Sequence, residues 1–179
     1  FLQVFLLMNG FDPTLISSAF KYKEFVRKAL KYSNITLPEL RGEDNLDRVI
    51  RRLARITRGL EPPNIEPIEI HTSNNKIVEK SFPPYFTAVR DFQEKERVIT
   101  FDDQIFNALK LVVSEPIFRH EIQRRFRHIL IDEYQDLNKA QISLVRMIAN
   151  GGARIFAVGD DDQLIYSWRN ARTQHLLVD

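Results

Sequence analysis

Acidic side chains follow two apolar runs in the C-terminal half of the sequence. The first run, residues 129–131, leads into Asp132 and Glu133, and the second run, residues 155–158, leads into the acidic segment 160–163. Short apolar runs bounded by polar residues are typical of parallel strands that are buried on both faces. We therefore predict two such strands, each ending in carboxylates.

The segment between the two runs has the start and stop signals of a helix. Asn138 can cap it, and Gln141 stands three residues later, where its side chain can return the capping bond. Asn150-Gly151-Gly152 supplies the stop. A strand, a helix and a second parallel strand form a crossover unit, which brings the C-terminal ends of both strands to the edge where open α/β folds bind ligands. We expect both acidic segments to converge at that edge.

Carboxylates at such an edge predict a bound cation. A buried carboxylate is costly unless a positive group compensates it, and Mg²⁺ is commonly held by one or two carboxylates together with substrate phosphates. In such a site Asp132 would hold the metal through its water shell, Glu133 would polarise an attacking water, and Gln163 would contact the terminal phosphate. An isolated Asp-Glu pair is more often a helix cap or a solvated turn, and it is the second acidic segment that favours a phosphate site.

The two segments also resemble the signature motifs of a known family. Residues 129–136 and 157–171 are similar to the second and third motifs of the UvrD/Rep/PcrA-type superfamily 1 DNA helicases. These motifs are Asp-Glu-Phe/Tyr-Gln-Asp, and Val-Gly-Asp-Asp-Asp-Gln-Ser-Ile-Tyr followed, after one variable residue, by Phe/Trp-Arg-Gly-Ala. Leu164 stands where Ser is usual in that family, and Asn170 where Gly is usual. Residues 99–103, Ile-Thr-Phe-Asp-Asp, resemble the segment with which the family's chain re-enters its motor domain.

The resemblance implies an α/β fold with two parts. Residues 97–179 would be a partial RecA-like P-loop NTPase core with parallel strands and a crossover helix, and residues 1–96 a mainly α-helical inserted domain. The implied cofactors are ATP and Mg²⁺, with Asp132 and Glu133 as the magnesium and water-activating carboxylates and Gln163 as the sensor of the terminal phosphate. The implied activity couples ATP hydrolysis to movement on single-stranded DNA and to duplex unwinding, 3′ to 5′ by analogy. Its partners would be single-stranded DNA, the junction with duplex, and the remaining helicase domains.

Three residues of the third motif are candidates for contact with single-stranded DNA by the same resemblance: Tyr166, Trp168 and Arg169. Tyr and Trp offer faces on which unpaired bases stack without sequence preference, and an adjacent Arg adds a phosphate or cation–π contact. Trp168 is the only tryptophan in the chain, and without its motif it would be interpreted as a core anchor.

A stripe of arginines lies on a helix that we expect over residues 44–58. Its members are Arg48, Arg51, Arg52, Arg55 and Arg58. The stripe is a candidate contact for the backbone of duplex DNA, and it is equally compatible with a solvated helix face. The family resemblance favours DNA, since it places an inserted helical domain here that touches the duplex.

Other elements are predicted from capping residues and apolar spacing. A cap and first-turn proline at Asp12-Pro13 predict a helix that continues to Tyr32, and Phe106, Leu109, Val112 and Val113 are expected to face inward from a helix over 101–113. The remaining expectations are a helix over 85–96 and a short hairpin that pairs 66–70 with 76–78.

Composition excludes several classes of site. The 179 residues hold no cysteine, so disulfides and thiolate metal sites are excluded, and the 4 histidines lack the spacing of a zinc site. A net charge of +2 does not by itself indicate a DNA-binding protein. The longest apolar stretch, Phe1–Met8, is too short to span a bilayer and resembles a remnant of a buried strand or helix. No membrane contact is expected, and the cytoplasm is the expected location.

The phosphate-binding loop that an ATPase of this kind needs is not in the sequence. No Gly-x-x-x-x-Gly-Lys-Ser/Thr segment occurs, and the chain holds only 6 glycines. We therefore expect an internal fragment of a larger helicase, inactive when isolated. Two other classes of function stay open: a non-catalytic DNA-binding or scaffold module of a helicase-like complex, and a metal-dependent nuclease built on Asp160–Asp162, which is ranked last because three consecutive carboxylates cannot all face one metal.

Overall fold

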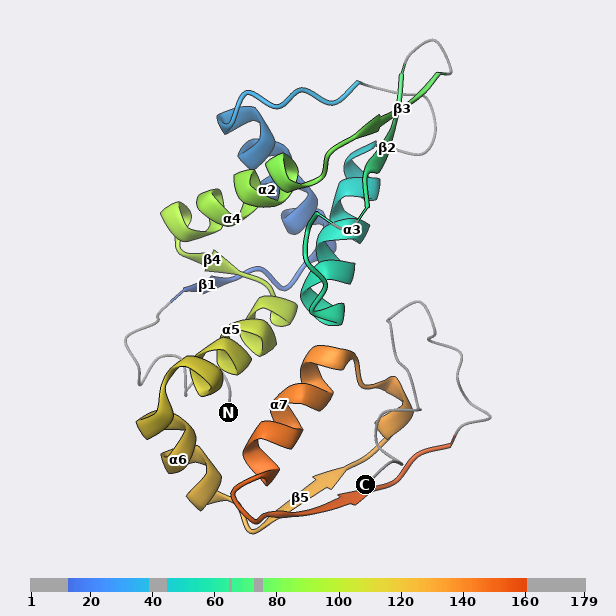
Figure 1. Ribbon diagram of the computed structural model, residues 1–179. Coiled ribbons are helices and arrows are strands. Elements are labelled where there is room, and N and C mark those ends of the chain that lie inside the picture. The colour runs from blue at the N-terminus through green and yellow to red at the C-terminus, as the bar shows by residue number, and fades with distance from the viewer. Residues whose placement is uncertain (1–12, 39–44, 65, 73–75, 161–179) are drawn as a thin grey trace. The chain divides into compact units, whose positions relative to one another are not determined.

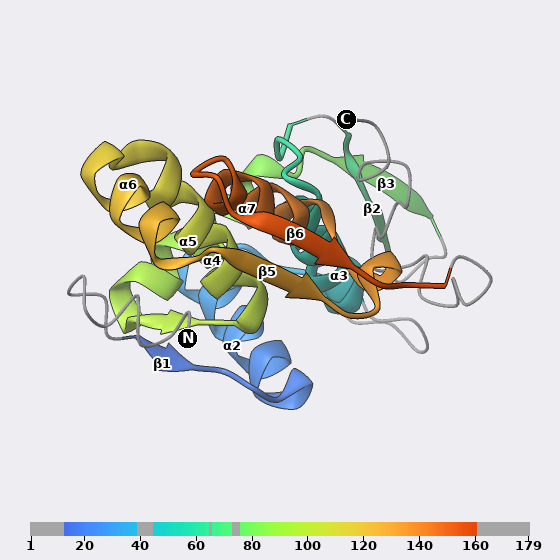
Figure 2. The ribbon, with the colours of Figure 1, turned by 90° about the horizontal axis from the view of Figure 1, so that it is seen from below.

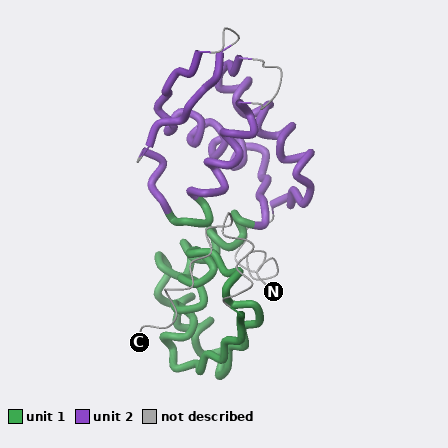
Figure 3. The backbone as a smooth tube through the Cα atoms, turned by 90° about the vertical axis from the view of Figure 1, so that its right-hand side faces the viewer, with its two compact units in different colours: residues 1–3, 57–60, 102–179 green, residues 4–56, 61–101 purple. Residues whose placement is uncertain are grey.

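The computed structural model describes residues 13–38, 45–64, 66–72 and 76–160, which fall into two compact units (Figure 3). Among these residues, unit 1 comprises 57–60 and 102–160. Unit 2 comprises the described parts of 13–56 and 61–101. The chain is α/β, with helices predominating over short strands (Figure 1).

Unit 2 begins with a short strand where the sequence predicted a helix. Thr14–Leu15 forms β1, which pairs in parallel with β4, Val98–Ile99. The Thr14 N–H donates to the Arg97 carbonyl at 2.7 Å, and the Ile16 N–H donates to the Ile99 carbonyl at 2.8 Å. The prediction of a helix starting at Asp12-Pro13 is therefore wrong, because pairing with a distant strand overrides the local proline signal; Asp12 itself lies outside the described residues. The helix α2 begins only at Ala19 and spans Ala19–Tyr32.

The other elements of unit 2 agree with their predictions to within a few residues. Helix α3 spans Asn45–Gly59, most of it in this unit, and α4 spans Pro83–Glu96. The hairpin is formed by β2, Ile68–His71, and β3, Ile77–Lys80, paired antiparallel with Ile70 opposite Val78. Along β2 buried and exposed residues alternate, so one face of the hairpin packs inward and the other meets solvent.

One apolar core holds unit 2 together. It joins α2, α3, α4 and β2, and its fully buried side chains include Val26, Val49, Phe82 and Val89. A buried polar residue fixes the start of α3: the Asn45 side chain donates to the carbonyls of Pro38 and His71 and accepts from the His71 N–H. Because both ends of this amide are satisfied, Asn45 anchors α3 to β2 without leaving an unpaired polar atom.

Unit 1 contains the predicted strand–helix–strand segment, preceded by two helices. These helices are α5, Phe101–Ser114, whose first residue is assigned to unit 2, and α6, Pro116–Arg125. Leu109 and Val112 are buried as predicted, whereas Val113 is 55% exposed. The inward placement of Val113 is therefore wrong, because adjacent residues of a helix point about 100° apart and Val112 takes the inner position.

The crossover itself is confirmed. Strand β5, His128–Ile131, pairs in parallel with β6, Arg154–Ala157, and helix α7, Lys139–Ala149, connects them. The capping box is present at the start of α7: the Asn138 side chain accepts from the Gln141 N–H at 3.1 Å, and the Gln141 side chain accepts from the Asn138 N–H at 2.9 Å. After α7 the chain turns at Gly152, whose φ of 99° favours a residue without a Cβ.

The two strands are not buried on both faces within the described part of the chain. Helix α7 lies over one face of the pair (Figures 1 and 2). On the opposite face, Leu130 and Phe156 are paired across the strands and are 80% and 71% exposed. The prediction of burial on both faces is wrong here, because the described residues of unit 1 provide a helical layer on one side only.

Candidate active site

The candidate site is the turn that follows β5, which we name the acidic turn and define as residues 132–136. Asp132 and Glu133 follow the last strand residue directly, and a single 3₁₀ turn, Tyr134–Asp136, leads on towards α7. Glu133 has φ 51° and ψ 49°, the left-handed conformation that is uncommon for a residue with a side chain. The Asp132 Oδ1 accepts from the Glu133 N–H at 3.0 Å, and this bond stabilises the reversal.

The acidic turn is joined to the end of β6. The Val158 N–H donates to the Ile131 carbonyl at 2.8 Å, and the Tyr134 N–H donates to the Val158 carbonyl at 3.1 Å. These bonds continue the parallel pairing beyond the strands, and they place the start of the second acidic segment beside the first. The predicted convergence is therefore confirmed as far as Asp160, the last described residue.

A buried amide connects the two segments through side-chain bonds. Gln135 is 3% exposed, its Nε2 donates to Glu133 Oε2 at 2.6 Å, and its Oε1 accepts from the Asp160 N–H at 3.1 Å. Sequence reasoning did not single out Gln135. The signal available to it was an uncharged amide within an acidic turn, which can donate to one carboxylate and accept from a backbone N–H at the same time.

The carboxylates themselves lie at the surface rather than in the interior. Asp132 and Glu133 are both exposed, so the expectation of carboxylates that burial makes costly is wrong for the described chain. They are exposed because they follow the strand ends instead of lying within the layer covered by α7. Water can therefore reach both groups, as a site that activates water requires.

The donor set of the acidic turn fits a magnesium ion held mainly by water and phosphate. Among the residues that the structure describes, no group of three or more histidine, cysteine or carboxylate side chains could form a metal cage. Mg²⁺ does not need such a cage, since it keeps several waters and uses one or two carboxylates plus substrate phosphates. Asp132 and Glu133 can supply those carboxylates, but a nuclease-type cluster has no support from the described residues.

The other predicted residues of the third motif lie outside the described residues. They are Gln163, Tyr166, Trp168 and Arg169, and the same holds for Asp161 and Asp162.

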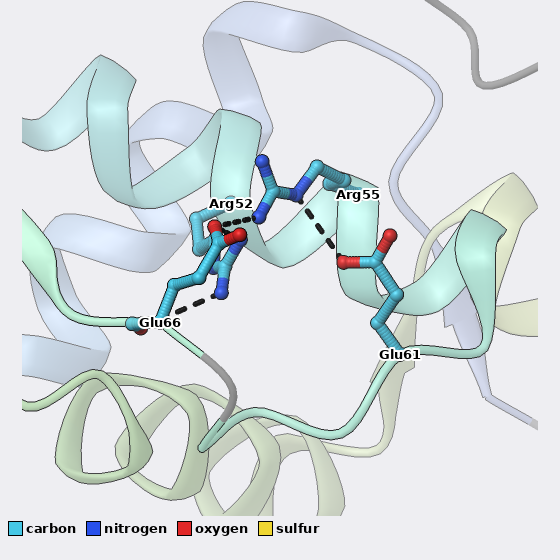
Figure 4. A network of polar contacts seen from close by, with 4 residues as sticks. All are labelled: Arg52, Arg55, Glu61 and Glu66. Carbon is cyan, nitrogen blue, oxygen red and sulfur yellow. Dashed lines mark hydrogen bonds and ion pairs between the residues drawn. The ribbon is translucent and has the colours of Figure 1, made fainter.

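Two arginines of the stripe on α3, Arg52 and Arg55, face carboxylates of unit 2 (Figure 4). Arg52 is 8% exposed, and its Nη1 lies 3.0 Å from Glu66 Oε2. Arg55 pairs with the same Glu66 carboxylate and, through its Nε, with Glu61 Oε2 at 3.3 Å. The five predicted arginines thus have different surroundings, listed in order along α3: Arg48 is half-buried with its Nη1 3.7 Å from Glu69 Oε2, Arg51 is exposed, Arg52 is buried, Arg55 is half-buried, and Arg58 is half-buried with its Nε 2.9 Å from Asp102 Oδ2.

Comparison with known proteins assigns the chain to a family. Residues 13–178 match the family described as the UvrD/REP helicase N-terminal domain. This match covers well over half of the chain, and the chain therefore belongs to the UvrD/Rep helicase family.

Curated relatives carry helicase names. ATP-dependent DNA helicase Rep of Buchnera aphidicola subsp. Schizaphis graminum is 33% identical over 114 residues, which are 64% of this chain and 17% of that protein. ATP-dependent DNA helicase Rep of Escherichia coli K12 is 44% identical over 81 residues, 45% of this chain and 12% of that protein. ATP-dependent DNA helicase PcrA of Staphylococcus epidermidis is 30% identical over 166 residues, 93% of this chain and 21% of that protein. The chain thus spans only about a fifth or less of these relatives.

A search for membrane-spanning helices gave none: within the described residues, every helix is too short or too polar to cross a bilayer.

Proposed function

We propose that this chain contributes the metal-binding and water-activating carboxylates of an ATP-dependent DNA helicase. The observation that carries the proposal is the acidic turn at the carboxyl end of a parallel strand pair, in a chain of the UvrD/Rep family. The relatives named Rep and PcrA are ATP-dependent DNA helicases. Because the 179 residues hold no Gly-x-x-x-x-Gly-Lys-Ser/Thr segment, the phosphate-binding loop would come from another part of a longer protein, and we expect the isolated chain to be inactive.

Each carboxylate of the acidic turn has a separate role in this proposal. Asp132 would hold Mg²⁺ through its water shell. Glu133 orients a water and accepts its proton as the water attacks. One oxygen of Glu133 already accepts a bond from Gln135, which leaves the other oxygen for the water. Bound Mg-ATP supplies the transferable phosphoryl group and the charge that the site must balance.

Gln163 completes the proposed nucleotide contacts. It lies three residues after Asp160, whose N–H is held beside the acidic turn, so the chain can carry its side chain to the terminal phosphate. The same segment continues to Tyr166, Trp168 and Arg169, our candidates for stacking and phosphate contacts with single-stranded DNA.

The duplex ahead of the motor is the proposed partner of the α3 arginines. Arg51 is the strongest of these candidates because it is exposed. Arg48, Arg52 and Arg55 face Glu69, Glu66 and Glu61, so their charge would reach a phosphate only in competition with those carboxylates. By analogy with the relatives, the complete protein would move 3′ to 5′ on single-stranded DNA and unwind duplex at the junction.

ATP turnover by the longer protein that contains this chain tests the proposal. We expect DNA-stimulated hydrolysis in the wild type, and its loss in Glu133→Gln with nucleotide binding retained, because the amide cannot accept the proton of the attacking water. Glu121→Gln is the matched control, since Glu121 is an exposed carboxylate on α6 that pairs with Arg125 on the same helix, away from the acidic turn.

The outcomes separate the candidate functions. Full turnover in Glu133→Gln would remove Glu133 from its role. DNA binding by the wild type without any ATP turnover would instead favour a non-catalytic DNA-binding or scaffold module.

A further inference from the structure

Gln135 is the least exposed side chain of the acidic turn, although it lies between acidic residues. It is 3% exposed, while Asp132 and Glu133 on the same turn are exposed. Burial of a primary amide is unfavourable unless its donors and acceptor are bonded. The hydrogen-bond partners of Gln135 therefore indicate its structural role.

Those bonds fix the amide in one orientation. The partner of Nε2 is the Glu133 carboxylate, which can only accept, and the partner of Oε1 is the Asp160 N–H, which can only donate. Exchanging the amide nitrogen and oxygen would break both bonds, so the assignment follows from the partners. The chain around the amide is also tightly packed: a Cβ added at Gly159 would lie 2.3 Å from the Gln135 Oε1 and 2.7 Å from the Tyr134 Cδ1.

The Glu133 side chain is exposed, although a general base must be held in one position. Because of this exposure, packing restricts its rotamer less than it would restrict that of a buried side chain. A general base must be kept within hydrogen-bond reach of the proton that it takes, and a displacement of about 1 Å can lower the rate about 100-fold. The bond at 2.6 Å from Gln135 Nε2 to Glu133 Oε2 restricts the carboxylate.

We propose that Gln135 is a positioning residue for Glu133: its buried amide holds one carboxylate oxygen in place and leaves the other directed to the attacking water. The proposal rests on the proposed function, because it assumes that Glu133 acts as the base. Gln135 does not touch the substrate in this account. The Asp160 N–H holds the amide oxygen, so the amide cannot rotate away from Glu133 without losing that bond as well.

Two substitutions separate this role from a merely structural one. Gln135→Met has nearly the same length and removes both bonds. Gln135→Glu keeps an acceptor for the Asp160 N–H, but it can donate to Glu133 only while its own carboxyl group carries a proton. Two neighbouring carboxyl groups share one proton at low pH and repel each other when both are ionised. If Gln135 positions Glu133, the pH profile of kcat for Gln135→Glu should therefore differ in shape from that of wild type.

The control is Gln123→Met, the same chemical change at another partly buried amide of unit 1. The Gln123 Nε2 donates to the Met147 carbonyl at 2.7 Å, away from the acidic turn. All variants are made in the longer protein that contains the chain. The readouts are kcat and KM for ATP hydrolysis, the pH profile of kcat, and the thermal midpoint.

We expect Gln135→Met to lower kcat by about 10–100-fold, as is typical when a group that orients a catalytic side chain is lost, with an unchanged KM for ATP. Gln135→Glu should have a higher kcat than Gln135→Met at low pH. This difference should disappear as the pH rises. Gln123→Met should keep the kcat of the wild type.

Two results would overturn the positioning role while Glu133→Gln remains inactive: a wild-type kcat in Gln135→Met, or a Gln135→Glu pH profile parallel to that of wild type. If Gln135→Met does not fold, the profile of Gln135→Glu decides by itself. Turnover in Glu133→Gln would instead refute the proposed function, so the two failures are distinguishable.

Discussion

Glu66→Gln tests whether the ion pairs of Arg52 and Arg55 with Glu66 stabilise unit 2. Glu66 neutralises the buried Arg52, and the same carboxylate pairs with Arg55 (Figure 4). Arg52 also lies over the Phe82 ring, with its Cζ 5.9 Å from the ring centroid. The substitution keeps the size of the side chain and removes only its charge.

The expected loss lies between the values for exposed and buried ion pairs. Breaking a fully buried pair costs about 3–5 kcal/mol, and an exposed pair contributes about 0.2–1 kcal/mol. Arg52 is 8% exposed but Glu66 is 56% exposed, so water screens one partner. The Gln amide oxygen can still accept one bond, and the contact from Arg52 Nη2 to the Glu66 backbone carbonyl at 3.4 Å remains. We therefore expect the free energy of unfolding to fall by about 1–2 kcal/mol.

Urea unfolding of the 179-residue chain, followed by circular dichroism at the helical band, measures this loss. With a slope of about 2 kcal/mol per molar urea, the midpoint should fall by roughly 0.5–1 M. Glu94→Gln on the exposed surface of α4 is the control, and its free energy should stay within about 0.5 kcal/mol of wild type. Equal midpoints for Glu66→Gln and Glu94→Gln would refute a structural role for the network and leave Arg52 and Arg55 as candidates for DNA contact alone.

Three further predictions concern separate parts of the chain. Burial raises the pKa of Tyr85 above its ordinary value of 10.0, so the wild type should lose stability as the pH rises above that value through the pKa of the folded state, and alkaline unfolding curves should show no such loss in Tyr85→Phe. Gly159→Ala would place a Cβ 2.3 Å from the Gln135 Oε1, so the amide must move and kcat for ATP hydrolysis in the longer protein should fall without a change in KM; a wild-type kcat would mean that the amide can shift at no cost to Glu133. Arg51→Gln should reduce the slope of log affinity for duplex DNA against log salt by about 1 if Arg51 contacts a phosphate, and an unchanged slope would make Arg51 a solvated residue.

Local signals in the sequence predicted much of the fold because they act over a few residues. The capping box of α7 and its glycine stop depend on backbone groups three to four positions apart, and both are present. The parallel order of β5 and β6 followed from the helix between them, because a helical crossover is the usual connection between parallel strands. The start of α2 was missed because β1 exists only through its pairing with β4, a contact between segments far apart in the chain.

The site was predicted in part for the same reason. Two strand ends of a crossover must meet at one edge, so the convergence of the acidic turn with Asp160 could be inferred. The linkage through Gln135 depends on side-chain geometry that strand order does not determine. The ion pairs of the α3 arginines could not be predicted from the sequence either. Glu61 and Glu66 belong to the segment after α3, and the spacing of the arginines does not determine where that segment runs.

Strand displacement by the longer protein tests whether duplex unwinding requires the Glu133 carboxylate. The substrate is a labelled duplex with a single-stranded tail at either its 3′ or its 5′ end, and wild type is compared with Glu133→Gln at saturating ATP and Mg²⁺. We expect ATP-dependent unwinding of the 3′-tailed duplex by wild type and none by Glu133→Gln. Unwinding by Glu133→Gln at the wild-type rate, or binding of both substrates by wild type without any ATP-dependent unwinding, would contradict this expectation.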